Sequence, residues 1–228
     1  INQSTRYFGT LLPDSSANNI MNPYYIQVDD SLVPGRMARM RIEFTTNEGY
    51  RTHSDFTAEI GTLQPTDPMG PDAYGYYCFD SGDVGYTKQP TYPWTEIYGN
   101  PQATQLNLPD TGDELDARTT VRLPFTFRYF GIDYDTISVC SNGFIAMGYS
   151  ENVQFRNKAI PSAMGPAAMI APFWDDLQVR SGAAVLTYYD QTNHRFIVEY
   201  YNMKNDQGSA NEKFQVILYD PQYHPALS

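Results

Sequence analysis

Strict alternation of apolar and polar residues is the feature of this chain that most restricts its fold. Between residues 121 and 129, every second side chain is apolar: Val121, Leu123, Phe125, Phe127 and Tyr129. A period of two places these side chains on one face of an extended segment, which predicts a half-buried β-strand. Pro124 has no backbone N–H and therefore predicts a sheet edge or a β-bulge within this strand. The same alternation over residues 37–44 predicts another strand.

Turn-forming residues separate further strand-like segments and predict antiparallel hairpins. Ser141-Asn142-Gly143 stands between the apolar runs 137–140 and 144–147, and Asn-Gly in this position is a strong hairpin signal. A second hairpin is predicted for residues 186–201, and a last strand for residues 214–219. Prolines disfavour a helix in the apolar stretch 161–176. The predicted fold class is therefore all-β.

A connector rich in proline and glycine, residues 64–72, divides the chain. The segment before it predicts short strands, including 24–28, 37–44 and 56–60, which are too few to close a sandwich. We therefore interpret residues 1–64 as the C-terminal part of an immunoglobulin-like β domain. Residues 65–228 are expected to form a second, larger unit. The expected architecture is a partial immunoglobulin-like sandwich followed by a larger antiparallel β-sandwich.

Charge and hydropathy exclude two classes of function. The formal net charge is −11, from 15 Lys and Arg against 26 Asp and Glu, and such a surface repels nucleic-acid phosphates. No apolar run has the length of a membrane span, so membrane insertion is not expected. Cys78 and Cys140 are the two cysteines. They form either one disulfide or two separate thiols, since neither has a metal-type spacing.

The residues needed for catalysis do not form a recognisable set. The histidines, His53, His194 and His224, lie beside predicted turns or near the end of the chain, away from any Ser- or Cys-centred motif. Asp175 and Asp176 are adjacent carboxylates, but neighbours on a strand point to opposite faces and cannot flank one bond. We therefore expect a protein without enzymatic activity.

Aspartates in the loops are candidate calcium ligands, because calcium binds several oxygen atoms at one place. Asp72, Asp80 and Asp83 bracket the first segment after the connector. Asp110, Asp113 and Asp116 crowd a later loop. Aspartate also forms turns without any metal, and this alternative applies to both groups. No other cofactor is expected.

Large aromatic side chains are candidate ligand-binding residues. Tyr92, Trp94 and Trp174 stand in loop-like segments, and Tyr and Trp are enriched in surfaces that bind proteins. Stacking on a glycan or contact with a protein is one interpretation. Packing of the rings against the sandwich is the other.

Three segments, in order along the chain, carry a resemblance to a known family. They are LPFTFRYFG at residues 123–131, YDTISVCSNGFIAMG at 134–148 and IAPFWDDL at 170–177. These segments resemble the nidogen-like extracellular domain. They are more closely similar to a β-sandwich of large secreted bacterial proteins, which often lies near gingipain-type peptidases and immunoglobulin-like repeats. Residues 70–77 are similar to the beginning of that bacterial module, and the likeness covers about residues 66–220.

The resemblance implies an extracellular or cell-surface location and carries no assigned catalytic residues. Similar bacterial modules continue beyond the strand at residues 215–219, so this module is expected to lack its last strand or strands. An exposed edge at residues 214–219 is therefore expected to pair with a neighbouring domain or subunit.

The leading hypothesis is a non-catalytic structural or adhesive module that mediates spacing or protein–protein contacts. One alternative is a carbohydrate- or protein-binding accessory module of a secreted hydrolase. The other is a subunit of an extracellular filament completed by strand exchange.

Overall fold

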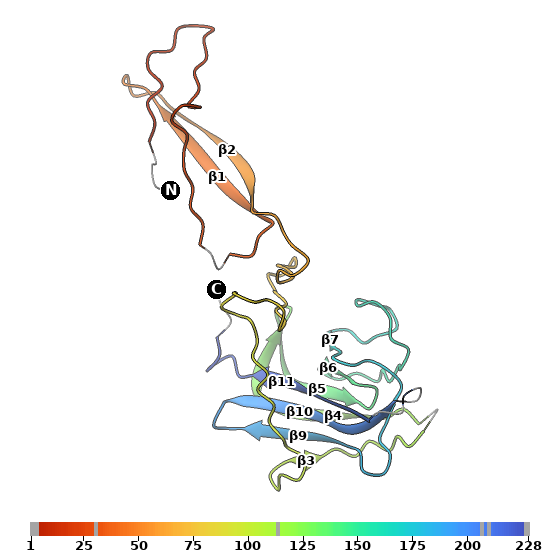
Figure 1. The fold of residues 1–228 in the computed structure, drawn as a ribbon. Coiled ribbons are helices and arrows are strands. Elements are labelled where there is room, and N and C mark those ends of the chain that lie inside the picture. The colour runs from red at the N-terminus through yellow and green to blue at the C-terminus, as the bar shows by residue number, and fades with distance from the viewer. Residues whose placement is uncertain (1–4, 30–31, 113–114, 206–207, 209–210, 226–228) are drawn as a thin grey trace. The chain divides into compact units, whose positions relative to one another are not determined.

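The computed structural model of the chain describes residues 5–29, 32–112, 115–205, 208 and 211–225. They form two compact units, residues 1–93 and 94–228, which are described separately below. Every strand pair in this part of the chain is antiparallel, and Figure 1 shows strands joined by loops. The prediction of an all-β protein is confirmed. Among the described residues, no helix has the length and apolar character needed to cross a bilayer.

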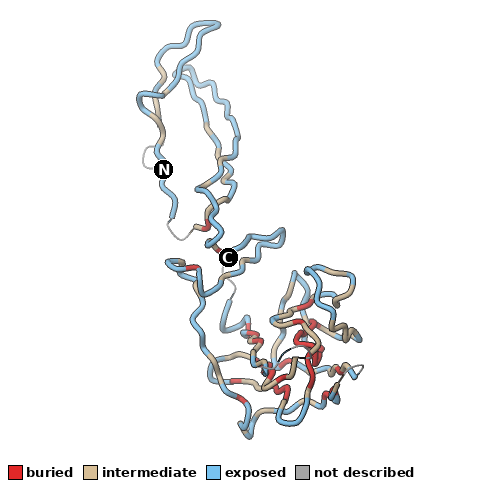
Figure 2. Tube along the Cα trace, turned by 45° about the vertical axis from the view of Figure 1, so that its right-hand side comes forward, coloured by how far each residue is buried: buried red, intermediate tan, exposed pale blue. Residues whose placement is uncertain are grey.

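The first unit is built on a single hairpin of β1 (Arg36–Thr45) and β2 (Arg51–Ile60). The predicted strand at residues 24–28 is not formed, and the side chains of Tyr25 and Ile26 are exposed. These side chains have no apolar layer to pack against, because the two-stranded sheet has no second sheet over it in the described residues. The pale blue of this unit in Figure 2 shows how little of it is buried. The immunoglobulin-like assignment stays a prediction.

Residues 61–93 fold with the hairpin rather than with the second unit. Met69 and Cys78 form an isolated antiparallel bridge, and the guanidinium group of Arg36 lies 5.7 Å from the ring centroid of Tyr77. The hydroxyl group of Tyr86 donates a hydrogen bond of 2.9 Å to Asp67. The predicted boundary at residues 64–65 therefore lies inside the first unit, and the division of the structure falls between Pro93 and Trp94.

The second unit contains two sheets. The larger sheet has the strand order β11-β10-β9-β3, and β8 pairs with the far end of β10. Its strands are β3 (Thr104–Gln105), β8 (Leu177–Gln178), β9 (Ala184–Asp190), β10 (Arg195–Asn205) and β11 (Asn211–Tyr219). The predicted hairpin at residues 186–201 and the predicted last strand are thus confirmed.

The smaller sheet has the strand order β4-β5-β6-β7. Its strands are β4 (Arg118–Tyr129), β5 (Ile132–Cys140), β6 (Phe144–Met147) and β7 (Met169–Ile170). The predicted Asn-Gly hairpin joins β5 to β6, with Cys140 opposite Phe144. The prediction from Pro124 of an edge or a bulge is confirmed, because β4 is an edge strand and its pairing with β5 also shifts register between Arg122 and Phe127.

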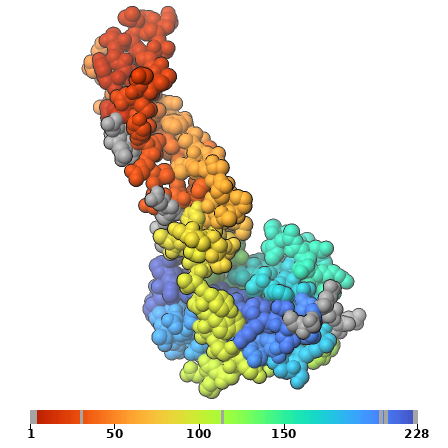
Figure 3. Space-filling model, viewed as in Figure 1, coloured from red at the N-terminus to blue at the C-terminus, as the bar shows by residue number. Residues whose placement is uncertain are grey.

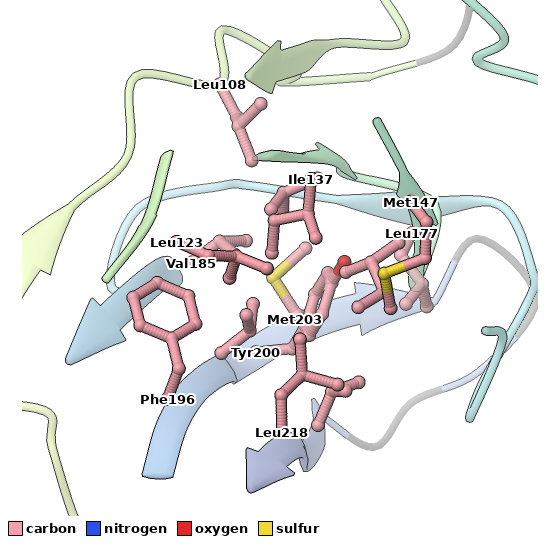
Figure 4. Packing of buried hydrophobic residues seen from close by; sticks show 14 of the residues in the cluster. Leu108, Leu123, Ile137, Met147, Leu177, Val185, Phe196, Tyr200, Met203 and Leu218 are labelled. Carbon is pink, nitrogen blue, oxygen red and sulfur yellow. The ribbon is translucent and has the colours of Figure 1, made fainter. Parts of the chain in front are cut away.

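A shared apolar core joins the two sheets into a sandwich. Ile137, Val139 and Met147 of the smaller sheet pack in one cluster with Val198 and Tyr200 of the larger sheet. Figure 4 shows Ile137, Met147 and Tyr200 among the side chains between the two layers. The core is buried because the alternation of each strand sends one set of side chains inward. The red segments of Figure 2 gather in this unit.

Candidate functional site

Two of the three segments that carry the family resemblance meet at one place, the turn between β5 and β6: residues 134–148 contain this turn, and residues 170–177 pack on it. The side chain of Asn142 donates hydrogen bonds to Asp116 Oδ1 at 2.7 Å and to the carbonyl oxygen of Val153 at 2.9 Å. Its own Oδ1 accepts the backbone N–H of Leu177 at 3.1 Å, and its carbonyl oxygen accepts the N–H of Asp175 at 3.3 Å. Asn142 is fully buried. It therefore ties three loops together, and its amide is occupied by structural contacts.

Gly143 is required by the close approach of the loop at residues 171–176. Its φ is +76°, in the left-handed region that favours glycine. A Cβ atom built on Gly143 would lie 1.8 Å from the carbonyl oxygen of Phe173. The N–H of Phe173 donates to the carbonyl oxygen of Gly143 at 3.4 Å. The Ser-Asn-Gly and Ala-Pro-Phe-Trp motifs thus occur together because their backbones pack directly on each other.

Two large aromatic residues support this turn from inside. The hydroxyl group of Tyr200, on β10, lies 2.9 Å from the carbonyl oxygens of both Cys140 and Phe144. Trp174 is 6% exposed, meets the ring of Phe144 edge-on and donates its indole N–H to the carbonyl oxygen of Gln154. The interpretation of Trp174 as a surface binding residue is therefore wrong. Its side chain belongs to the core, which was the alternative considered from the sequence.

Carboxylates near this turn are used in structural contacts. Asp175 accepts the side-chain amide of Asn205 at 2.8 Å and the N–H of Asp176 at 2.9 Å. Asp110 is 1% exposed, and its Oδ2 meets no hydrogen-bond donor among the described residues. Burial, together with the charges of Asp116 and Asp176, raises the pKa of Asp110 to about 6, although hydrogen bonds from Ser141 and Gly112 oppose this change. Asp110 is a buried titratable group that sequence patterns did not single out from its neighbours.

The aspartates proposed as calcium ligands do not gather into a metal site. Asp72 accepts the N–H groups of Tyr74 and Tyr76 at 2.8 and 2.9 Å, and Asp80 accepts the N–H of Gly82 at 2.6 Å. Asp83 accepts the N–H of Asp80 at 2.6 Å. Within the described ranges, no three His, Cys, Asp or Glu side chains form a group that could hold a metal ion. The carboxylates instead stabilise turns, which was the alternative interpretation. In the second group, Asp113 lies outside the described residues.

The two cysteines are free thiols in the structure, so the disulfide considered from the sequence is not formed. Cys78 is exposed in the first unit, whereas Cys140 is buried in the second. Cys140 packs with Phe144, Met169 and Trp174. Burial raises the pKa of the Cys140 thiol to about 12, which makes it a poor nucleophile.

The three histidines take part in ordinary packing and surface contacts. His194 stacks on Tyr223 with the ring centroids 3.5 Å apart, and His224 Nε2 lies 2.9 Å from the carbonyl oxygen of Asn193. His53 lies on β2 of the first unit, 3.9 Å from Asp55. None of these contacts joins a histidine to a serine or cysteine nucleophile.

A groove of about 920 Å³ opens between β4 and the edge formed by β3 and β9. Leu106, Leu123, Phe125 and Phe196 supply much of its apolar lining. Arg122 and Asp135 are the charged residues of that lining, and they face each other at 3.9 Å. The lining holds no histidine or cysteine and no pair of carboxylates. Its titratable side chains are Arg122, Asp135, Tyr188 and Tyr189.

Residues 94–103 cover the outer face of the larger sheet, and we call this segment the strap. Ile97 is fully buried there against Ala184, Leu186 and Ile197. Figure 3 shows the strap, yellow to yellow-green, lying across the blue strands. The chain therefore buries both faces of this sheet, one against the smaller sheet and one beneath the strap.

Two aromatic rings lie near Lys213, one from the strap and one from β10. The Nζ atom of Lys213 lies 4.8 Å from the ring centroids of both Trp94 and Tyr201, and Tyr98 stacks on Tyr201 with centroids 3.7 Å apart. Trp94 is half-buried, whereas Tyr92 is 85% exposed in the first unit. The structure therefore places Trp94 in an aromatic–cation cluster. Its role in binding a ligand, and that of Tyr92, stays a prediction.

Four side chains of the sheet anchor the strap. Glu199 Oε2 accepts the N–H of Ile97 at 3.0 Å, and Gln215 Nε2 donates to the carbonyl oxygen of Thr95 at 2.6 Å. Arg195 donates to the hydroxyl oxygen of Thr95 at 2.7 Å, and Lys213 binds Glu96. The sequence patterns did not identify these four anchoring residues. The only signal was Glu199, a charged residue within an otherwise apolar part of β10.

β11 is an edge strand in the described part of the chain. It pairs with β10 on one side, and no described strand lies on the other. The residues after it turn back toward the β9–β10 hairpin, because the N–H of Asp220 donates to the carbonyl oxygen of His194 and His224 reaches Asn193. Residues 220–225 therefore do not pair with the side of β11 that faces away from β10.

Comparison with known proteins gives one match. The model of a family described as NIDO related matches residues 85–222, which cover more than half of the chain and include almost all described residues of the sandwich. No curated protein and no solved structure matches. Modules of the NIDO type occur in extracellular proteins. The sandwich, its open edge and the two motifs joined at the β5–β6 turn are thus features of a chain that belongs to the NIDO-related family.

Proposed function

We propose that this chain is a non-catalytic structural or adhesive module of a secreted or cell-surface protein, and that it makes protein–protein contacts through the edge of β11. The one-sided pairing of β11 is the observation that carries this proposal. An open edge offers a row of backbone donors and acceptors that an added strand can pair with.

The hydrogen-bond pattern identifies which groups are available at this edge. In an antiparallel pair, hydrogen-bonded and non-hydrogen-bonded residue pairs alternate. Asp220 donates to His194, so Leu218 and Val216 are expected to bond to β10 as well. The N–H groups of Gln215, Ile217 and Tyr219 then point away from β10. A strand supplied by a neighbouring domain or subunit would accept these N–H groups.

The chemistry of the described residues supports a role without catalysis. Asn142 and Asp175 of the joined motifs, and Tyr200 beneath them on β10, are engaged in structural hydrogen bonds. The groove beside β4 contains no set of groups able to transfer protons or to attack a substrate. The NIDO-related match supports the extracellular setting.

The test introduces a proline at Tyr219, which removes one outward N–H without breaking a bond to β10. Tyr219 is 40% exposed, so Tyr219→Ala is a matched control that loses the ring and keeps the N–H. A second copy of the chain is the probe, and sedimentation over a wide concentration range is the measurement. We expect self-association by the native chain and by Tyr219→Ala, and its loss in Tyr219→Pro. A native chain that stays monomeric, with rapid hydrogen exchange at Ile217 and Tyr219 throughout, would refute pairing between subunits at this edge.

A further inference from the structure

We infer that the strap is a pH-sensitive latch: a proton shared by Glu96 and Glu199 holds it on the larger sheet, and loss of that proton releases it. This inference concerns the outer face of the sheet and does not depend on the proposed role of the β11 edge.

The latch rests first on the burial of Glu199. This residue of β10 is fully buried on the apolar outer face of the sheet. Its Oε2 accepts the N–H of Ile97 at 3.0 Å and the side-chain amide of Gln215 at 2.9 Å. No donor among the described N–H and O–H groups reaches its Oε1. The carboxyl group of Glu96 is the hydrogen-bonding neighbour of Glu199 on the strap side.

Two carboxyl groups form a hydrogen bond to each other only when one of them holds a proton. Burial and the hydrogen bond with Glu96 raise the pKa of Glu199. Partial burial raises the pKa of Glu96, but hydrogen bonds from Lys213 and Glu199 outweigh that effect, so the pKa is lowered. The proton therefore resides on Glu199, and the negative charge resides on Glu96 beside Lys213.

The other groups around Glu199 do not neutralise it once it ionises. On β11, Lys213 binds Glu96, and Gln215 is uncharged. On β10, Arg195 binds Asp190 of β9 at 2.9 Å and Thr95 of the strap. Other ionisable groups on the described part of this face are the phenols of Tyr98, Tyr188, Tyr201 and Tyr219, and Tyr188 bonds to Gln102 at 3.4 Å.

Ionisation of Glu199 would place two adjacent negative charges at a buried site, where charge is poorly tolerated. Lifting the strap relieves this repulsion, because water then reaches Glu199. Since burial raises the pKa of Glu199, the latch is closed at low pH and opens as the pH rises through that pKa. Opening also uncovers the apolar face formed by Ala184, Leu186 and Ile197.

Hydrogen exchange of the Ile97 amide tests the latch, because that N–H bonds directly to Glu199. We would measure its protection factor in the full chain at a series of pH values, corrected for the intrinsic exchange rate. We expect a fall of about tenfold for each pH unit between the ordinary carboxyl pKa and the raised pKa of Glu199, followed by constant protection above the raised pKa, because one pKa unit corresponds to a factor of ten. Gly148 donates to Thr136 in the other sheet at 2.8 Å, and its protection should stay constant.

Two variants identify the groups responsible. Glu199→Gln keeps an acceptor for Ile97 and a donor for Glu96, so protection of Ile97 should no longer depend on pH. Glu96→Gln removes the neighbouring charge from an exposed side chain, so the fall should be smaller. The latch would be overturned by an equal fall in Glu199→Gln, by constant protection in the native chain, or by a parallel fall at Gly148.

Discussion

Replacement of Gly143 by alanine is expected to destabilise the sandwich severely. At φ +76°, an L-residue costs about 1–2 kcal/mol relative to glycine. The new Cβ atom would also lie 1.8 Å from the carbonyl oxygen of Phe173, so that backbone must retreat by more than about 1 Å to reach normal contact. Retreat strains the neighbouring bonds from Phe173 and Asp175 to the turn. With about 1–3 kcal/mol for overpacking, the expected loss is about 2–5 kcal/mol.

Gly148→Ala is the matched control for this substitution. Gly148 has nearly the same φ, +75°, but its added Cβ would lie 3.4 Å from the ring of Tyr134, which is ordinary contact. This control should therefore lose only the conformational contribution of about 1–2 kcal/mol. The difference between the two variants isolates the close approach of the two motifs.

Denaturant unfolding followed by tryptophan fluorescence is the assay. Both tryptophans, Trp94 and Trp174, lie in the second unit, and Trp174 is buried beside the turn. We expect Gly143→Ala to lower the midpoint much more than Gly148→Ala, with an unchanged slope. Similar midpoints for the two variants would refute the argument that backbone contact with Phe173 requires glycine.

Two further predictions concern buried groups of the same unit. The folded pKa of Asp110, about 6, lies above the ordinary value of 3.8, so its contribution to stability is fully present below pH 3.8 and is lost as the pH rises through about 6. Asp110→Asn should remove this loss of stability, which is up to about 3 kcal/mol. The measurement is the free energy of unfolding from pH 4 to 8, and a variant whose stability falls with pH as steeply as that of the native chain would contradict the prediction. Titration with a thiol reagent should detect Cys78 alone in the native chain, because Cys140 is buried, and both cysteines after denaturation. If no thiol reacts in either state, the two cysteines form a disulfide and the prediction is wrong.

Local sequence patterns were sufficient to predict the longer strands of the sandwich, but not the two-residue strands β3, β7 and β8. The alternation from Val121 to Tyr129, the Asn142-Gly143 turn and the run ending at Tyr219 each depend on neighbouring residues, and all three are found as predicted. Pro124 predicted either an edge or a bulge, because a missing N–H disturbs strand pairing, and the structure has both. The same kind of pattern failed at residues 24–28, since alternation alone does not supply a sheet to pack against.

The sequence by itself determined the all-β class, the hairpins and the family motifs, since backbone geometry and turn chemistry act over a few residues. Only the tertiary structure decided that Trp174 is buried, that Asp72, Asp80 and Asp83 serve turns, and that Glu199 meets the strap. These outcomes depend on partners far apart in the chain: Ile97 and Glu199 are separated by 102 positions. The burial and the pKa of a side chain depend on contacts between residues that are distant in the sequence, so no pattern within a single strand could predict them.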